Sequence, residues 1–389
     1  MKKTLLVLLL SFTTFVSFSQ QADTVKTYHV GIFANLFLDS SFTEKNYRYS
    51  NQMPKHILPG LDFVQGALMA VDSIKTTKNL VVKVFDLRSS DQSLQQLKNK
   101  NTFDSLDLMI GAVSGTEYRS LADIALQKNI PFVSATYPND GGVTNNPFTI
   151  VVNSTLPVHC EAIYNFVLKN HATANILYVR KKGQQEDRLQ SYFAGFNRGA
   201  KEGTQLLKWK TILLQDSFSV NNLKNSLDST KTNLVICGSL DENFGRKIVT
   251  ELNGIRKQYT LEIAGMPTWE TIKDLSLPEY KELSVYHSST FYNTGTLKWN
   301  YFTKTFTDVT YGRPSDLAFK GYELSWNFVN LLLKHGPSLM QNLNDRSYRL
   351  FTEYDFKPII NETNGRPDYF ENKKIYILKR SNGLVSRMN

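Results

Sequence analysis

The amino-acid sequence predicts an α/β protein with two lobes, each built on a doubly wound parallel sheet. From residue 28 onward, strand-like apolar runs alternate with helical stretches, which is typical of consecutive βαβ units. The strand-like runs are almost continuously apolar, as in sheets that helices cover on both faces. The alternation starts again after about residue 154, and a length of 389 residues suits two domains of ordinary size.

The N-terminus is expected to be a signal peptide, residues 1–19. Lys2 and Lys3 precede an apolar run that is too short to span a membrane and that breaks up into Ser and Thr. Residues 17–19, Ser-Phe-Ser, resemble a signal-peptidase site, and no cysteine follows the apolar run to carry a lipid. We therefore expect an exported, periplasmic chain that starts near Gln20, without membrane insertion of the mature chain.

The first lobe is expected to contain four strands with helices between them. The strands are expected at 28–38, 79–87, 107–113 and 130–136, and the helices at 60–74 and 116–129. One stripe at helical spacing marks the expected buried face of the first helix: Leu61, Val64, Leu68, Val71 and Ile74.

Residues 39–60 form an insert rich in Tyr, Asn and Ser at the mouth of the first lobe. Two interpretations stay open for this insert. It is a solvated loop, or it lines the cleft with Tyr47 or Tyr49 stacked on a ligand ring or docked on a partner.

The second lobe repeats the pattern. Helices are expected at 159–170, 187–203 and 243–255, and strands at 174–181, 206–214, 233–240 and 261–267. Cys160 and Cys237 lie far apart on apolar faces, and a chain of this size needs no disulfide to form a core. We expect both thiols to be free, with a disulfide between them as the alternative.

Composition and motifs argue against several functions. The formal charge of +10 is spread over the chain, and no Lys/Arg run is longer than residues 180–182, so nucleic acid is not an expected partner. The six histidines and two cysteines show no metal-ligand spacing. No hydrolase, P-loop or dinucleotide motif appears, so neither catalytic residues nor cofactors are expected.

Several phrases together resemble one family. The segments at 60–74, 108–136 and 146–154, continued at 313–333 and 363–385, are similar in order and spacing to type 1 periplasmic binding proteins, in particular the branched-chain amino-acid receptors of ABC importers. The resemblance covers nearly the whole mature chain. It implies a ligand that binds where two hinged lobes close on each other.

The resemblance also implies three crossings between the lobes, near 150–155, 285–292 and 350–358. The expected domains follow from these crossings: 20–153 with 286–352 for the N-terminal lobe, and 154–285 with 353–389 for the C-terminal lobe.

Ligand-contact candidates in the first lobe follow the expected strands, because ligands of open α/β sheets gather beyond the carboxyl ends of the strands. These candidates are Asn35, Ser114, Gly115, Thr116, Thr136, Tyr137 and Asn139. A carboxylate at 114–116 would meet free helix N–H groups and hydroxyls, and the resemblance implies that an amino-acid carboxylate binds there. The alternative is that Ser114 or Thr116 only caps the helix.

The second lobe departs from the family pattern. The resemblance implies a Tyr-Gly pair after the strand at 174–181 and an acidic residue after the strand at 261–267. Residues 181–188 read KKGQQEDR instead, and Thr268 and Trp269 occupy the acidic position. Asp241 and Glu270 are substitutes for the missing carboxylate. The second-lobe candidates are Asp241, Thr268, Trp269 and, in the second crossing, Ser288.

The expected function is a solute-binding receptor that closes on a small polar ligand, an amino acid or a similar molecule, and delivers it to the permease of an ABC importer. A different class keeps the same fold without transport: a periplasmic sensor or an envelope-assembly partner. The absence of the family's acidic residue weakens the receptor hypothesis without establishing the sensor or assembly-partner hypothesis.

Overall fold

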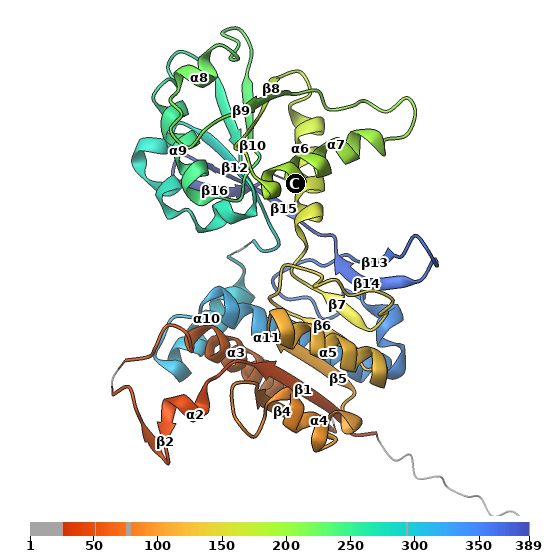
Figure 1. Cartoon of the computed structure of the whole chain (residues 1–389). Helices are drawn as coiled ribbons and strands as arrows, with labels where there is room; N and C mark the ends of the chain where they lie inside the picture. The colour runs from red at the N-terminus through yellow and green to blue at the C-terminus, as the bar shows by residue number, and fades with distance from the viewer. Residues whose placement is uncertain (1–25, 51, 75–78, 293–294, 389) are drawn as a thin grey trace, which may run out of the picture.

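The computed structural model describes residues 26–50, 52–74, 79–292 and 295–388. The expected signal peptide lies outside these residues. Within them, no helix is both long and apolar enough to cross a membrane. The chain forms two α/β lobes, each around a mostly parallel seven-stranded sheet, as the sequence predicted (Figure 1).

The first-lobe sheet has the strand order β13-β14-β7-β6-β5-β1-β4. Five strands come from the N-terminal part of the chain and run parallel: β1 (Tyr28–Ala34), β4 (Leu80–Asp86), β5 (Leu108–Ala112), β6 (Phe132–Ser134) and β7 (Thr149–Val151). The C-terminal part adds β14 (Pro367–Asn372), which is parallel to β7, and β13 (Phe356–Ile360), which is antiparallel to β14.

Helices cover both faces of this sheet. Inward-facing residues of β1 such as Ile32 pack with α3 (Leu58–Ile74) and α11 (Asp316–His335). Phe33 points to the other face and packs with α5 (Gly115–Lys128) and α4 (Leu94–Asn99). The remaining elements of this lobe are α2 (Leu38–Ser41), β2 (Phe42–Thr43), β3 (Asn46–Tyr47), η2 (Thr102–Ser105), α10 (Leu297–Thr310) and η6 (Gly336–Asn342).

Two glycines bring α3 and α11 into backbone contact. A Cβ added at Gly66 would lie 2.0 Å from the carbonyl oxygen of Ala318, and one added at Gly321 would lie 2.0 Å from that of Phe63. This contact turns the face of α3 around Gly66 toward α11. Leu68, expected on the buried stripe, is instead 39% exposed.

Replacing Gly66 by Val is therefore expected to lower the free energy of unfolding by at least about 1–3 kcal/mol, because the helices must separate to admit the side chain. Gly195 in α7 (Gln184–Arg198) is the matched control, since an added Cβ there meets no atom within 4 Å. Gly195→Ala should raise stability by about 0.5–1 kcal/mol. Urea unfolding followed by circular dichroism measures both, and an unchanged midpoint for Gly66→Val would contradict the close contact.

The second-lobe sheet has the order β16-β15-β12-β11-β10-β8-β9. Its parallel strands are β8 (Asn175–Arg180), β9 (Lys210–Leu213), β10 (Asn233–Cys237), β11 (Leu261–Ala264) and β12 (Ser284–Ser289). Two antiparallel strands, β15 (Tyr376–Ser381) and β16 (Leu384–Arg387), complete it. The helical elements are α6 (Leu156–Asn170), α7, α8 (Asn221–Lys224), α9 (Glu242–Asn253), η3 (Pro267–Thr271), η4 (Lys273–Ser276) and η5 (Pro278–Tyr280).

Both cysteines lie in the core of this lobe as free thiols. Burial raises the pKa of each thiol to about 12, so both stay protonated and unreactive at neutral pH. The disulfide alternative is wrong for this structure.

The chain passes between the sheets at three places: after β7, after β12 and between β14 and β15. Hydrogen bonds join the crossings to one another. Thr155 N–H donates to Glu371 Oε1 over 2.8 Å, and Thr290 Oγ1 donates to Asn153 Oδ1 over 3.1 Å. These hydrogen bonds connect the stretches of chain that Figure 1 shows passing between the two lobes.

Two expected boundaries are wrong. Residues 356–372 were assigned to the second lobe, with a crossing near 350–358, but β13 and β14 belong to the first sheet. The physical reason is that β14 pairs with β7, which lies more than 200 residues earlier in the chain. Local sequence patterns carry no information about a contact between such distant segments. Likewise, residues 286–289 continue β12 in the second sheet, so the first lobe does not resume at 286.

The insert at 39–60 has structure of its own where it is described. Strands β2 and β3 pair in a short hairpin, and the ring of Tyr47 contacts the rings of Phe42 and Tyr49, with centroids 5.5 and 5.7 Å away. Tyr47 also donates a hydrogen bond to Gln52 O over 2.9 Å. These contacts lie within the insert and stabilise its local structure. A role of the insert in ligand binding stays a prediction.

Candidate functional site

The carboxyl ends of the parallel strands of each lobe lie on the edge that leads to the other lobe. In the first sheet, β7 ends at Val151 and the chain continues directly into α6 of the second lobe. In the second sheet, β12 ends at Ser289 and the chain returns to the first lobe. Residues that follow these strand ends therefore lie on the sides of the two lobes that the crossings connect, which are called the first and second walls below; ligands of open α/β sheets usually gather at such strand ends.

The start of α5 is the part of the first wall best suited to an anion. Ser114 precedes the helix in an extended conformation, and no side chain caps the first turn. Ser114, Gly115 and Thr116 are all exposed. The Thr116 hydroxyl makes one long contact, 3.4 Å, with Glu117 Oε2. The free N–H groups and the helix dipole at this end favour a bound negative charge.

Gly115 allows the turn that opens this helix end. Its φ is +57°, a left-handed conformation that side chains disfavour, and no atom lies within 4 Å of an added Cβ. Glu117 in the first turn pairs with Arg88 over 2.8 Å, so its carboxylate is balanced by a neighbouring cation. The space at the start of α5 is therefore open, and the nearby Glu117 carboxylate, paired with Arg88, does not cancel the preference of this helix end for an anion.

The last residue of β4, Asp86, holds the loop that follows β1. The buried carboxylate of Asp86 accepts hydrogen bonds from the backbone N–H groups of Leu36 (2.8 Å), Phe37 (3.2 Å) and Leu38 (2.8 Å). Asn35 is half-buried, and its Oδ1 has no hydrogen-bond partner within the described residues. Asp86 thus fixes the loop that presents Asn35, and Asn35 retains a polar atom for a further partner.

Some of the residues after β6 lie at the strand-end wall, and others pack against the core. The carbonyl of Thr136 accepts a hydrogen bond from Asn153 Nδ2 over 3.0 Å, which ties this strand end to the first crossing. The half-buried ring of Tyr137 packs on Tyr118, with centroids 4.9 Å apart. Asn139 is exposed, and its Oδ1 accepts from Gly141 N–H over 3.2 Å. Asn139 therefore stabilises the turn at residues 139–141, and part of the Tyr137 ring packs against the core.

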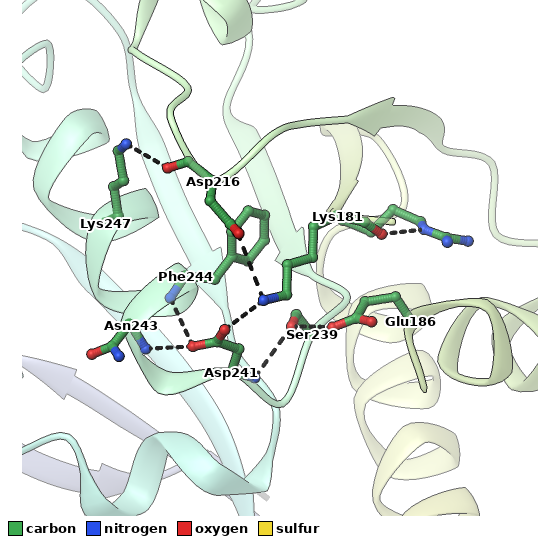
Figure 2. A network of polar contacts seen from close by, with 9 residues as sticks. Lys181, Glu186, Asp216, Ser239, Asp241, Asn243, Phe244 and Lys247 are labelled. Carbon is green, nitrogen blue, oxygen red and sulfur yellow. Dashed lines mark hydrogen bonds and ion pairs between the residues drawn. The ribbon is translucent and has the colours of Figure 1, made fainter. Parts of the chain in front are cut away.

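A charged network forms the second wall after β8 and β10 (Figure 2). Lys181 Nζ lies 2.5 Å from Asp241 Oδ2 and 3.7 Å from Asp216 Oδ1. Asp241 also caps α9 by accepting from the N–H groups of Asn243 (2.9 Å) and Phe244 (3.2 Å).

These contacts fix the charge state of Asp241. The hydrogen bond from Lys181 is the main cause that lowers the pKa of Asp241, and the two backbone N–H groups add to it. The same contact raises the pKa of Lys181. The Asp241 carboxylate therefore already has a cation and two N–H partners, which leaves it less available to a ligand ammonium group.

Three other second-lobe candidates make contacts within their own lobe. Trp269 is fully buried and packs in the hydrophobic core, where its ring closely approaches Gly245 and Gly265, so it offers no exposed surface to a ligand in this structure. Ser288 is buried as well, with its hydroxyl 2.9 Å from Nδ1 of His159. Thr268 is half-buried, and its hydroxyl donates to Leu240 O over 3.1 Å.

Glu270, which the sequence offered only as a substitute carboxylate, lies near a buried lysine of the other lobe, Lys320, which was not among the candidates. Glu270 follows β11, and its Oε1 accepts from Ser289 Oγ over 3.0 Å. Burial of the carboxyl group raises the pKa of Glu270, and the nearby Lys320 of α11 acts against that rise. Burial in turn lowers the pKa of Lys320, against the influence of Glu270. Glu270 belongs to the second lobe and Lys320 to the first, so sequence spacing gave no signal of their proximity.

A cavity of about 520 Å³ lies beside Glu270. Its lining combines Glu270 and Arg380 of the second lobe, Phe291 and Tyr292 of the second crossing, and Asp316 of the first lobe. Arg380 donates to the backbone oxygen of Glu270 over 3.0 Å and so steadies the loop that carries it. Residues 114–116 do not line this cavity.

The fold is that of type 1 periplasmic binding proteins. Solved structures of branched-chain amino acid ABC transporter substrate-binding proteins share the two-lobe architecture over nearly the full length of both chains. No protein-family model matches the sequence, and no curated protein matches it significantly.

Three solved structures illustrate the likeness. A protein assigned as a branched-chain amino acid ABC transporter in Rhodospirillum rubrum is 12% identical, with a TM-score of 0.66, and covers 93% of this chain and 100% of its own. A branched-chain amino acid ABC transporter periplasmic ligand-binding protein of Burkholderia xenovorans is 12% identical, with a TM-score of 0.62 and coverages of 93% and 95%. An ABC transporter substrate-binding protein of Desulfitobacterium hafniense in complex with Leu is 13% identical, with a TM-score of 0.56 and coverages of 93% and 100%. Identities this low show the fold alone.

Proposed function

We propose that the protein is a non-enzymatic receptor that closes its two lobes on a small polar ligand, an amino acid or a similar molecule, and delivers it to the permease of an ABC importer. The observation that carries this proposal is the start of α5, where exposed hydroxyls and uncapped N–H groups stand at the edge of the first lobe that leads to the second. The proposal includes export to the periplasm after cleavage near Ser19.

The proposal assigns opposite ends of the ligand to opposite lobes. A ligand carboxylate would accept hydrogen bonds from Ser114, Thr116 and the first N–H groups of α5. A ligand ammonium group would bind Glu270, because the other substitute carboxylate named from the sequence, Asp241, already pairs with Lys181. Closure about the three crossings would bring both groups to the ligand.

A ligand screen combined with small-angle scattering tests this function. Amino acids, short peptides, nucleosides and sugars are screened for an upward shift of the melting temperature, since a ligand that binds only the folded state stabilises it. The expected result is that an amino acid or a similar zwitterion raises the melting temperature and reduces the radius of gyration. A verified ligand that left the scattering profile unchanged at saturation would contradict closure.

The alternative is a periplasmic sensor or envelope-assembly partner with the same fold. Two observations favour it over a receptor of the usual kind: the Lys181–Asp241 ion pair and the burial of Trp269 leave few second-lobe groups for a ligand. A screen in which none of these compounds raises the melting temperature would support this alternative.

A further inference from the structure

A second hollow lies within the first lobe, lined by residues of that lobe alone. It has a volume of about 440 Å³, within the usual range for small-molecule sites. The start of α10, the middle of α11 and residues 347–351 surround it. None of the residues assigned above to the inter-lobe ligand belongs to this groove.

The walls of the groove are aromatic and aliphatic. Tyr322 and Trp326 project from α11 and are half-buried. Leu297 and Tyr301, one turn apart on α10, are 88% and 69% exposed. Large apolar side chains that gather around a hollow and stay exposed are typical of a binding site. The walls therefore suit a ligand with an apolar body.

The groove also holds a cation that has no counter-ion among the described residues. Arg349 lines it, is half-buried, and makes one long hydrogen bond, from Nη2 to Asn344 O over 3.4 Å. The two carboxylates that influence it electrostatically are engaged elsewhere: Glu353 pairs with Lys374 over 3.2 Å, and Asp355 pairs with Lys357 over 3.3 Å.

Two further cations lie near Arg349. Arg346 is close enough to act on the guanidinium, and the exposed Lys298 lines the groove from α10. A guanidinium binds a carboxylate through two parallel hydrogen bonds, and such bonds are stronger where water is partly excluded. The charged side chains that line the groove, Lys298 and Arg349, are both cations and therefore suit an anion.

We infer that this groove binds a small carboxylic acid with an aromatic or aliphatic body, with its carboxylate on Arg349 and its body against Tyr301, Tyr322 and Trp326. Binding here requires no closure of the lobes. The inference is thus independent of the proposed transport function, and either can fail without the other.

Fluorine NMR of protein labelled with 5-fluorotryptophan tests the inference at the site itself. The chain has four tryptophans, and the resonance that disappears in Trp326→Phe identifies the reporter in the groove. The probe is 4-phenylbutyrate, and the uncharged 4-phenylbutan-1-ol is its matched control. We expect the carboxylate to shift the Trp326 resonance in a saturable way at lower concentration than the alcohol.

Variants then separate charge from apolar contact. Arg349→Gln is expected to weaken binding of 4-phenylbutyrate about tenfold or more and to leave binding of the alcohol unchanged, because hydrogen bonds to charged groups are the stronger ones. Tyr301→Ala should weaken both compounds. Arg198→Gln, at an exposed position of the second lobe, is the control that should change neither.

Three results would overturn the inference: a Trp326 resonance that does not move at millimolar 4-phenylbutyrate, equal binding of the acid and the alcohol, or an Arg349→Gln variant that binds the acid as the wild type does. Melting temperatures of all variants are measured alongside, so that a folding defect is recognised. If the Arg349→Gln variant still binds the alcohol, its groove is intact. A loss of acid binding alone is then attributable to the missing guanidinium.

Discussion

Loss of the two hydroxyls at the start of α5, in the double variant Ser114→Ala, Thr116→Val, is expected to weaken ligand binding at least about a hundredfold, since each hydrogen bond to a charged group contributes about 1.5–3 kcal/mol. The variant should keep its melting temperature, because the Ser114 side chain makes no capping bond and the Thr116 hydroxyl makes only one long contact. Isothermal titration calorimetry with the ligand found in the screen measures the affinity.

The control for this variant is a serine that does cap a helix. Ser93 accepts a hydrogen bond from Gln96 N–H at the start of α4. Ser93→Ala should therefore lower the stability of the protein by about 1 kcal/mol and leave affinity nearly unchanged. The opposite outcome for the double variant, lower stability with full affinity, would make Ser114 and Thr116 structural residues.

Replacing Glu323 by Ala is expected to lower the free energy of unfolding by about 3–5 kcal/mol, the cost of breaking a buried polar network. Glu323 is buried on α11 and accepts hydrogen bonds from Phe351 N–H (2.9 Å), Thr352 N–H (2.5 Å) and Thr352 Oγ1 (2.6 Å). Without it, these three donors would be left without partners in the core, next to the segment that leads to β13.

Glu323→Gln is the matched test. The amide oxygen can keep both backbone bonds, and the Thr352 hydroxyl can accept from the amide nitrogen, so the loss should be much smaller than for Ala. Urea unfolding of the two variants against the wild type measures the difference. Equal stability of the Ala variant and the wild type would show that the network contributes little.

The sequence predicted the fold class well because that class follows from local patterns. Runs such as 108–112 are continuously apolar, and the stretches between them have helical spacing, so alternation alone indicates a covered parallel sheet. Strands β13 and β14 are expected in the wrong lobe because Phe370 of β14 pairs with Ile150 of β7, and nothing near either residue signals the other.

Of the candidate site, the sequence could predict only those positions that follow directly from where a strand ends. Ser114 and Thr136 lie on the expected edge, since their position depends on the sheet alone. Trp269 also follows a strand, but its ring turns into the core against Gly245 and Gly265, a direction that side-chain packing decides. The proximity of Glu270 and Lys320 arises from the arrangement of the two lobes, which no sequence spacing encodes.

The interleaved course of the chain has a consequence for the order of folding. The first sheet is complete only when β14 has paired with β7, and the second only when β15 has paired with β12. A nascent chain that ends before residue 367 therefore leaves both sheets with an unpaired edge, however much of each lobe it contains. Contacts between such distant segments form slowly, so we expect the two lobes to mature together, late in synthesis, rather than one after the other.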